Sequence, residues 1–174
     1  MGPLALKLEE RYSYGDYLTW NDDQRWELID GIPYNMSPGP NRRHQGISME
    51  LSRQLSTYLL GKPCKAYHAP FDVRLPEGDE SDEETCTVVQ PDLVVEILSP
   101  STSGRDLKLK LNLYEGRGVR EYWVVDPIGA TVMVFSLGGD GRYGRPAVYT
   151  GEDIAPVGIF TELTIDLRTL FAPD

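Results

Sequence analysis

Two carboxylates, Asp92 and Glu96, lie inside the run VVQPDLVVEILSP, which spans Val88 to Pro100 and is one of the most apolar segments of the chain. A buried β-strand rarely carries charged side chains unless they are paired or used, because removing a charge from water is costly. Two acids on one strand can hold a metal ion or accept hydrogen bonds within the fold. This run is therefore the first candidate for a functional site.

The segments before this run predict a helix, a hairpin and a longer helix. Ser13 followed by Asp16 is a helix-capping pattern, and RWELIDGIPYNMSPGP indicates a hairpin that turns at Asp30 and Gly31. RRHQGISMELSRQLSTYLLGK then has a helical periodicity that ends at Gly61. Its apolar face consists of Ile47, Leu51, Leu55, Tyr58 and Leu59.

The segments around and after the run predict strands and one more helix. CKAYHAPFDVRL and CTVVQPDLVVEIL have strand composition, and LKLKLNLYEGRG predicts a helix that ends at Gly116 and Gly118. REYWVVDP and ATVMVFS predict further strands, and the tail TELTIDLRTLF predicts a strand or a docked helical turn. This order indicates an α/β fold in which helices flank a central mixed β-sheet.

Composition sets the broad class of the protein. The chain has 174 residues, of which 40% are apolar and 25% charged, as in a globular protein with one domain over residues 1–174. The net charge of −10 argues against tight non-specific binding to nucleic acid, which normally uses a basic surface. Part of the acid lies in EGDESDEE, from Glu77 to Glu84, which is typical of an exposed loop.

The sequence also indicates a compartment. No apolar run reaches the ~18 residues of a membrane helix, and the N-terminal segment does not resemble a signal peptide. Cys64 and Cys86 have neither metal spacing nor a CxxC partner, so free thiols in a reducing compartment are expected. We therefore expect a cytoplasmic protein without membrane contact.

Several separated motifs occur together in one order: RWELIDGIPYNMSPGPNRRHQ, VVQPDLVVEILSPSTSGRD, YEGRGVREYWVVDP and LTIDLRTLF. With them the chain resembles the Uma-two family of restriction endonuclease-like proteins, a branch of the PD-(D/E)XK nuclease superfamily, from about Tyr12 to Phe171. The resemblance implies a restriction endonuclease-like core, hydrolysis of phosphodiester bonds in DNA, and Mg²⁺ or Mn²⁺ as cofactor. It implies Asp92 and Glu96 as catalytic metal ligands.

The resemblance also implies a catalytic lysine. In the superfamily it lies two residues after the strand glutamate, where this chain has Leu98. Uma-two proteins instead have Asp, Lys and Tyr at four-residue spacing on the next helix, and Asp106, Lys110 and Tyr114 match that pattern. Lys110 is thus the candidate catalytic lysine, with Asp106 and Tyr114 as substrate contacts. The alternative is an ordinary solvent-facing lysine, for which Lys108 is the control position.

Other residues match the family less directly. Glu27 lies where the family has a hairpin glutamate and is a candidate auxiliary acid, and Glu50 is a weaker candidate for the same role. Arg43 and His44, in RRHQ, are candidate phosphate contacts, although a histidine at a helix start is more often structural. A basic stretch along the long helix and its exit would mark where DNA lies; it would consist of Arg42, Arg43, Arg53, Lys62 and Lys65.

The run departs from the family pattern in one respect. In the family a first strand ends in VQPD, a hairpin follows, and a second strand contains the glutamate, whereas here TVVQPD continues directly into LVVEILSPS. On one extended strand Asp92 and Glu96 lie ~13 Å apart, whereas ligands of one Mg²⁺ must lie within ~4 Å of each other. Three explanations are open: a deletion that damages the metal site, a bend at Pro91-Asp92, or a hairpin of the whole protein that this sequence lacks. The third is favoured, because losing a strand would remove much of the core.

Three functions follow from these observations. The first is a metal-dependent DNA endonuclease with Asp92, Glu96, Lys110 and Glu27 at its site. The second is a weak or inactive member that serves as a binding or assembly module, for which a homodimer is one form. The third is a structural protein whose acids accept hydrogen bonds. Convergence of Asp92, Glu96 and Lys110 favours the first function, and separation of Asp92 from Glu96 on one continuous strand favours the second.

Overall fold

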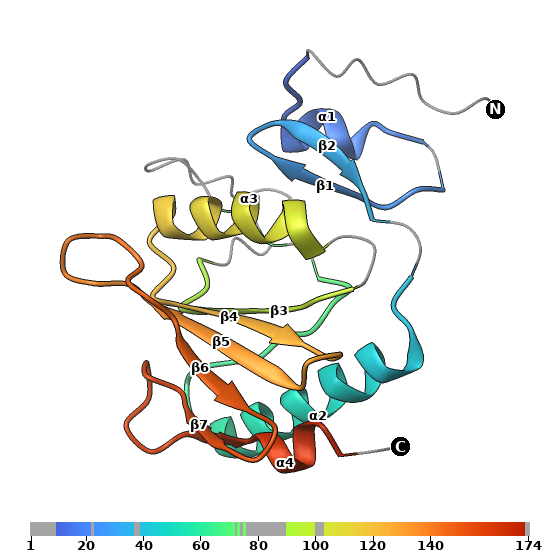
Figure 1. Cartoon of the computed structure of the whole chain (residues 1–174). Coiled ribbons are helices and arrows are strands. Elements are labelled where there is room, and N and C mark those ends of the chain that lie inside the picture. The colour runs from blue at the N-terminus through green and yellow to red at the C-terminus, as the bar shows by residue number, and fades with distance from the viewer. Residues whose placement is uncertain are drawn as a thin grey trace. The chain divides into compact units, whose positions relative to one another are not determined.

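The computed structural model describes residues 10–21, 23–36, 39–71, 73, 75, 90–99 and 103–172, with the backbone alone for 103–106. Residues 1–40 and 41–174 form two compact units (Figure 1). A single domain over residues 1–174 stays a prediction. No helix in the described residues is long and apolar enough to cross a membrane.

The first unit contains a short helix and a hairpin. Helix α1 (Tyr14–Leu18) begins with the predicted capping box, in which the Ser13 hydroxyl accepts from the Asp16 amide and the Asp16 carboxylate accepts from the Ser13 amide. Strands β1 (Trp26–Ile29) and β2 (Ile32–Asn35) pair antiparallel. Gly31, in the turn, has a φ of 73° and packs so closely that a Cβ would lie 3.2 Å from the Tyr12 backbone.

The second unit is built on a mixed sheet with the strand order β3-β4-β5-β6. Strands β3 (Leu93–Ile97) and β4 (Glu121–Asp126) are parallel and are joined by helix α3 (Ser103–Gly116). Strands β5 (Thr131–Ser136) and β6 (Ala147–Thr150) add antiparallel pairs. The expected α/β fold with a central mixed sheet flanked by helices is confirmed.

The two faces of the sheet are covered by different helices (Figure 1). Trp123 and Val125 point to one face and pack with helix α2 (Arg42–Leu59), whose predicted apolar face is the buried one. Tyr122 and Val124 point to the opposite face and pack with α3. Every residue of β4 except Asp126 is buried, as expected for a strand covered on both sides.

The C-terminal segment closes the α2 side of the sheet. Strands β7 (Ile154–Pro156) and β8 (Thr164–Asp166) form a separate antiparallel pair, and helix α4 (Leu167–Leu170) follows directly. Leu167 and Leu170 belong to the same core as α2. The tail therefore forms both of the predicted alternatives, a strand and then a helical turn.

Two predicted strands differ from the structure. Residues 64–71 form no strand, although CKAYHAPFDVRL has strand composition; Pro70 cannot donate to a β-ladder, and none of the described strands pairs with the segment. In CTVVQPDLVVEIL the strand begins only at Leu93, and the start of that segment lies outside the described residues.

Candidate active site

Glu96, Lys110 and Tyr114 meet between β3 and α3. The Lys110 Nζ donates to Glu96 Oε1 at 3.1 Å, and the Tyr114 hydroxyl donates to the same oxygen at 2.9 Å. The Lys110 side chain is only 12% exposed and that of Glu96 27% exposed, so the ion pair is partly shielded from water. The sequence thus brings together one carboxylate, one cation and one phenol in a space of a few ångströms.

Local structure explains this arrangement. Lys110 and Tyr114 are four residues apart on α3, which places them on one face of the helix. Leu107 and Leu111 of the same helix pack into the core against β4, so the helix is anchored with that face over the sheet. Lys108 is exposed, which makes it a suitable control for Lys110.

Asp92 does not join this cluster. It lies at a bend immediately before β3, and its carboxylate pairs with Arg120 at 3.3 Å, with both side chains about 60% exposed. Its backbone carbonyl accepts from the Glu121 amide, which continues the β3–β4 ladder without a break. A bend at Asp92, one of the three explanations left open by the sequence, is present, but it does not bring the Asp92 carboxylate to Glu96.

This geometry bears on the metal ion. Asp92 and Glu96 stand at opposite ends of one extended segment, ~13 Å apart at ~3.3 Å per residue, so the pair does not fit the coordination sphere of one Mg²⁺. Within the described ranges no three His, Cys, Asp or Glu residues cluster as a metal site. Glu96 alone fits the other common arrangement, in which one carboxylate, waters and substrate phosphates hold the ion.

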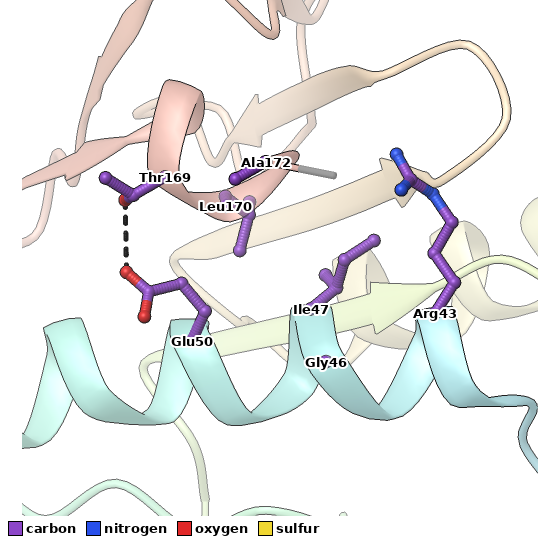
Figure 2. A pocket seen from close by; sticks show the side chains of 7 residues that line it. All are labelled: Arg43, Gly46, Ile47, Glu50, Thr169, Leu170 and Ala172. Atoms are coloured by element: carbon purple, nitrogen blue, oxygen red, sulfur yellow. Dashed lines mark hydrogen bonds between the residues drawn. The ribbon is translucent and has the colours of Figure 1, made fainter. Parts of the chain in front are cut away.

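The arginine and histidine that begin α2 have structural contacts. The Arg43 Nε donates to the carbonyl of Pro127, and the His44 amide donates to the side chain of Asn41, which caps the helix. The His44 Nδ1 atom is buried and has no hydrogen-bond partner in the described part of the chain. Arg43 also lines a cavity of about 140 Å³ between α2 and the C-terminal segment (Figure 2).

The expected basic stretch along α2 is partly neutralised. Arg53 forms two hydrogen bonds with Glu50, at 2.6 and 2.7 Å. The Lys62 ammonium lies 3.1 Å from the centre of the Tyr58 ring and donates to the Tyr58 carbonyl. These contacts weaken the case for α2 as a surface that binds phosphates.

Comparisons with known proteins give the family. A family model described as "Uma2: Putative restriction endonuclease" matches residues 14–168. The chain belongs to the Uma2 family.

Two further proteins resemble this Uma2 chain. The "Uncharacterized protein slr1290" of Synechocystis sp. is 29% identical in an alignment of 145 positions that covers 74% of this chain and 75% of that protein. A solved structure from Anabaena variabilis, described as a "putative nuclease belonging to DUF820", has a TM-score of 0.71 at 19% identity. The match covers 91% of this chain and 96% of that one, which shows that the two share a fold.

Two residues that the Uma2 pattern implies stay predictions. Glu27 lies on β1, opposite Tyr34, within the first compact unit. The backbone of Asp106 lies in α3, but its side chain is outside the described residues.

The sequence pattern missed Glu121, at the start of β4. Its side chain is 2% exposed, and it accepts hydrogen bonds from the Trp123 indole and from the amides of Gly158 and Ile159. Glu121 lies two residues before Trp123 and therefore points to the same face of the sheet. An acid inside the apolar run REYWVVDP is the same signal that drew attention to Glu96, and it could have identified this residue.

Proposed function

We propose that this Uma2 protein hydrolyses phosphodiester bonds in DNA with the help of Mg²⁺ or Mn²⁺, at the Glu96, Lys110 and Tyr114 cluster. The observation that carries the proposal is the direct contact of Lys110 with Glu96, which joins the strand glutamate to the helix lysine. Family membership supports the same chemistry. The cytoplasm is the proposed compartment.

Each residue has a role in this proposal. A bound divalent ion would polarise a phosphate and lower the pKa of a water, and Glu96 would hold it. Both donated hydrogen bonds fall on Glu96 Oε1, so Oε2 would bind the ion without loss of those bonds. Lys110 would stabilise negative charge on the phosphate, and Tyr114 would fix the orientation of the Glu96 carboxylate.

A second candidate function follows from Asp92. Its pairing with Arg120 leaves one carboxylate at the described site, where the PD-(D/E)XK pattern has two. A protein with a reduced site would bind nucleic acid or another partner and cleave slowly or not at all. This is the binding-module alternative, and the same experiment separates it from the nuclease.

The test measures cleavage of plasmid and single-stranded DNA with Mg²⁺ or Mn²⁺ by the wild type and three variants. Glu96→Gln and Lys110→Met should each lower the rate by about 100-fold or more, as loss of a charge-stabilising group does. Lys108→Met, on the exposed side of the same helix, should keep the wild-type rate.

Circular dichroism and thermal unfolding of each variant check that the fold is kept. Cleavage by Glu96→Gln at the wild-type rate would contradict the proposed nuclease site. DNA binding by a wild type that does not cleave would favour the binding module.

A further inference from the structure

The cavity between α2 and the C-terminal segment lies within the second unit and is large enough for an organic molecule. Its volume is about 140 Å³, whereas one water needs roughly 10–15 Å³ and an apolar cavity of ~150 Å³ can hold benzene. The residues that line it belong to α2 or to the stretch from Thr169 to Ala172. The space therefore suits a ligand with a body of about six carbon atoms.

The middle of this cavity is apolar and its two ends are charged. Ile47 and Leu170 line the middle and belong to the main core, where they are only 2% and 3% exposed. Arg43 stands at one end and Glu50 at the other (Figure 2), and their separation in sequence corresponds to ~10 Å along a helix. A ligand that fits this lining has an apolar body and a charged group.

The acidic end already has its partners. Glu50 accepts hydrogen bonds from Arg53 at 2.6 and 2.7 Å. It also accepts from the side chains of Gln54 and Thr169, both at 3.0 Å. The charge of Glu50 is thus balanced by a cation within the fold, and this end of the cavity does not need a ligand of opposite charge.

The basic end is held in place without being neutralised by its partner. The Nε of Arg43 donates to the carbonyl oxygen of Pro127 at 3.1 Å, and a carbonyl carries no formal charge. This bond orients the guanidinium, and it uses Nε alone, so the two Nη groups face the cavity end as further donors. Four other arginines of the described structure have a carboxylate partner instead: Arg53, Arg120, Arg142 and Arg168. A half-buried guanidinium bonded to a neutral carbonyl favours an anion beside it.

Shape and charge together select the class of anion. The two Nη groups of a guanidinium form a planar fork that matches the two oxygens of a carboxylate. A phosphate ion has no apolar body for the middle of the cavity, and its larger charge is repelled more strongly by the net charge of −10. We propose that the cavity binds a small organic carboxylate, whose carboxylate group pairs with Arg43 and whose apolar body lies against Ile47 and Leu170.

This site is separate from the proposed nuclease site. It lies on the α2 face of the sheet, whereas Glu96 meets Lys110 and Tyr114 of α3 on the opposite face. Arg43 is thus assigned a ligand other than the DNA phosphate that the Uma2 pattern suggested for it. Carboxylate binding here is independent of DNA cleavage.

The first test titrates the full chain with sodium benzoate and with sodium hexanoate, a flat and a linear carboxylate. Isothermal titration calorimetry should give a single site with a dissociation constant of about 1 mM or lower for at least one of them. Benzamide has the shape of benzoate without its charge, and acetate and inorganic phosphate have a charge without the apolar body. Each of these three should bind at least about 10-fold more weakly.

A second measurement locates the ligand. Nuclear Overhauser effects should connect the protons of the bound carboxylate with the methyl groups of Ile47 and Leu170, which line the cavity. The ligand should also raise the midpoint of thermal unfolding, because it binds the folded state. Ala172→Phe, at an exposed lining position, should abolish both effects by filling the space.

Three variants test the role of the guanidinium. Arg43→Met keeps the apolar part of the side chain and removes the fork, so the carboxylate should bind at least about 10-fold more weakly. Arg43→Lys keeps the charge without the fork and should retain only part of the affinity. Arg42→Met, at the exposed neighbouring position outside the lining, is the matched control and should bind as the wild type does.

A chain that ends at Ala172 is a further control, because it lacks the carboxylates of Asp174. It should bind the carboxylate as the full chain does. Binding at least about 10-fold tighter by this shorter chain would mean that the chain's own C-terminus competes for Arg43, and it would overturn the proposal.

Other contrary outcomes are equally clear. Failure of both benzoate and hexanoate to bind, or equal binding by the wild type and Arg43→Met, would overturn the proposed site. Inorganic phosphate bound as tightly as the carboxylates would make Arg43 a phosphate contact instead. Ligand contacts away from Ile47 and Leu170 would place the binding elsewhere and contradict the assignment of this cavity.

Discussion

At the scale of single residues, Glu121 is the buried charged side chain of the described structure. Three donors surround its carboxylate: the Trp123 indole at 3.0 Å, the Gly158 amide at 3.1 Å and the Ile159 amide at 3.2 Å. Two of them belong to the loop that follows β7. Glu121 therefore ties this loop to the start of β4, next to the point where Asp92 joins the ladder.

Glu121→Ala should lower the free energy of unfolding by about 3 kcal/mol, because buried donors lose their acceptor. Glu121→Gln keeps one acceptor oxygen and should lose about half as much. Urea unfolding of both variants measures this. Glu162→Ala, at an exposed position, is the control, and equal stabilities for Glu121→Ala and the control would contradict the assigned role.

At the scale of elements, polar side chains join α2 to the C-terminal segment. Gln54 accepts from the Asp166 amide at 2.8 Å and donates to Glu50 and Thr169, and Thr169 also donates to Glu50 (Figure 2). The side chain of Glu50 thus has a structural role between α2 and α4. The expectation of Glu50 as an auxiliary acid has no support from these contacts.

The same contacts predict a pH dependence. Hydrogen bonds from Arg53 hold the pKa of Glu50 below its ordinary value, Thr169 and Gln54 add to this effect, and burial opposes it. A carboxyl group whose pKa is lower in the folded than in the unfolded state stabilises the fold at pH values above its unfolded-state pKa of about 4.3. That contribution is lost as the pH falls through the folded-state pKa.

Glu50→Gln should therefore destabilise the protein by about 1 kcal/mol or less at pH 7, and the difference from the wild type should vanish as the pH falls well below about 4. Urea unfolding as a function of pH measures it. In a chain that carries Arg53→Met, the main donor is absent and the effect of Glu50→Gln should shrink. A difference that grows toward low pH would contradict this account.

At the scale of the whole molecule, the two apolar cores consist of residues of the second unit. Both clusters lie between residues 47 and 171, whereas the described part of the first unit buries only Ile29 and Pro33. A unit of 40 residues buries too little surface to be stable by itself, while one of 134 residues can be.

Residues 41–174 expressed alone should therefore unfold in a single cooperative transition, with a midpoint close to that of the full chain. Residues 1–40 alone should not fold. Calorimetry of the two fragments and of the full chain measures this. Loss of cooperativity in residues 41–174 would mean that the chain folds as the single domain expected from its length.

Local sequence determined the helices named below and the part of the site that lies on α3. Capping at Ser13, the apolar face of α2 and the end of α3 at Gly116 all depend on residues within one or two helical turns, so spacing is enough to predict them. The side-by-side placement of Lys110 and Tyr114 on α3 has the same origin. With the family pattern, these spacings identified the residues that meet Glu96.

Tertiary structure alone decided which partner each acid has. Asp92 pairs with Arg120, which is 28 residues away, and Glu121 bonds to a loop 37 residues away. Residues 64–71 form no strand despite their composition, because a strand needs a neighbour for its hydrogen bonds. Such partners depend on which strands lie side by side and in which register, and the periodicity of one segment does not contain that information.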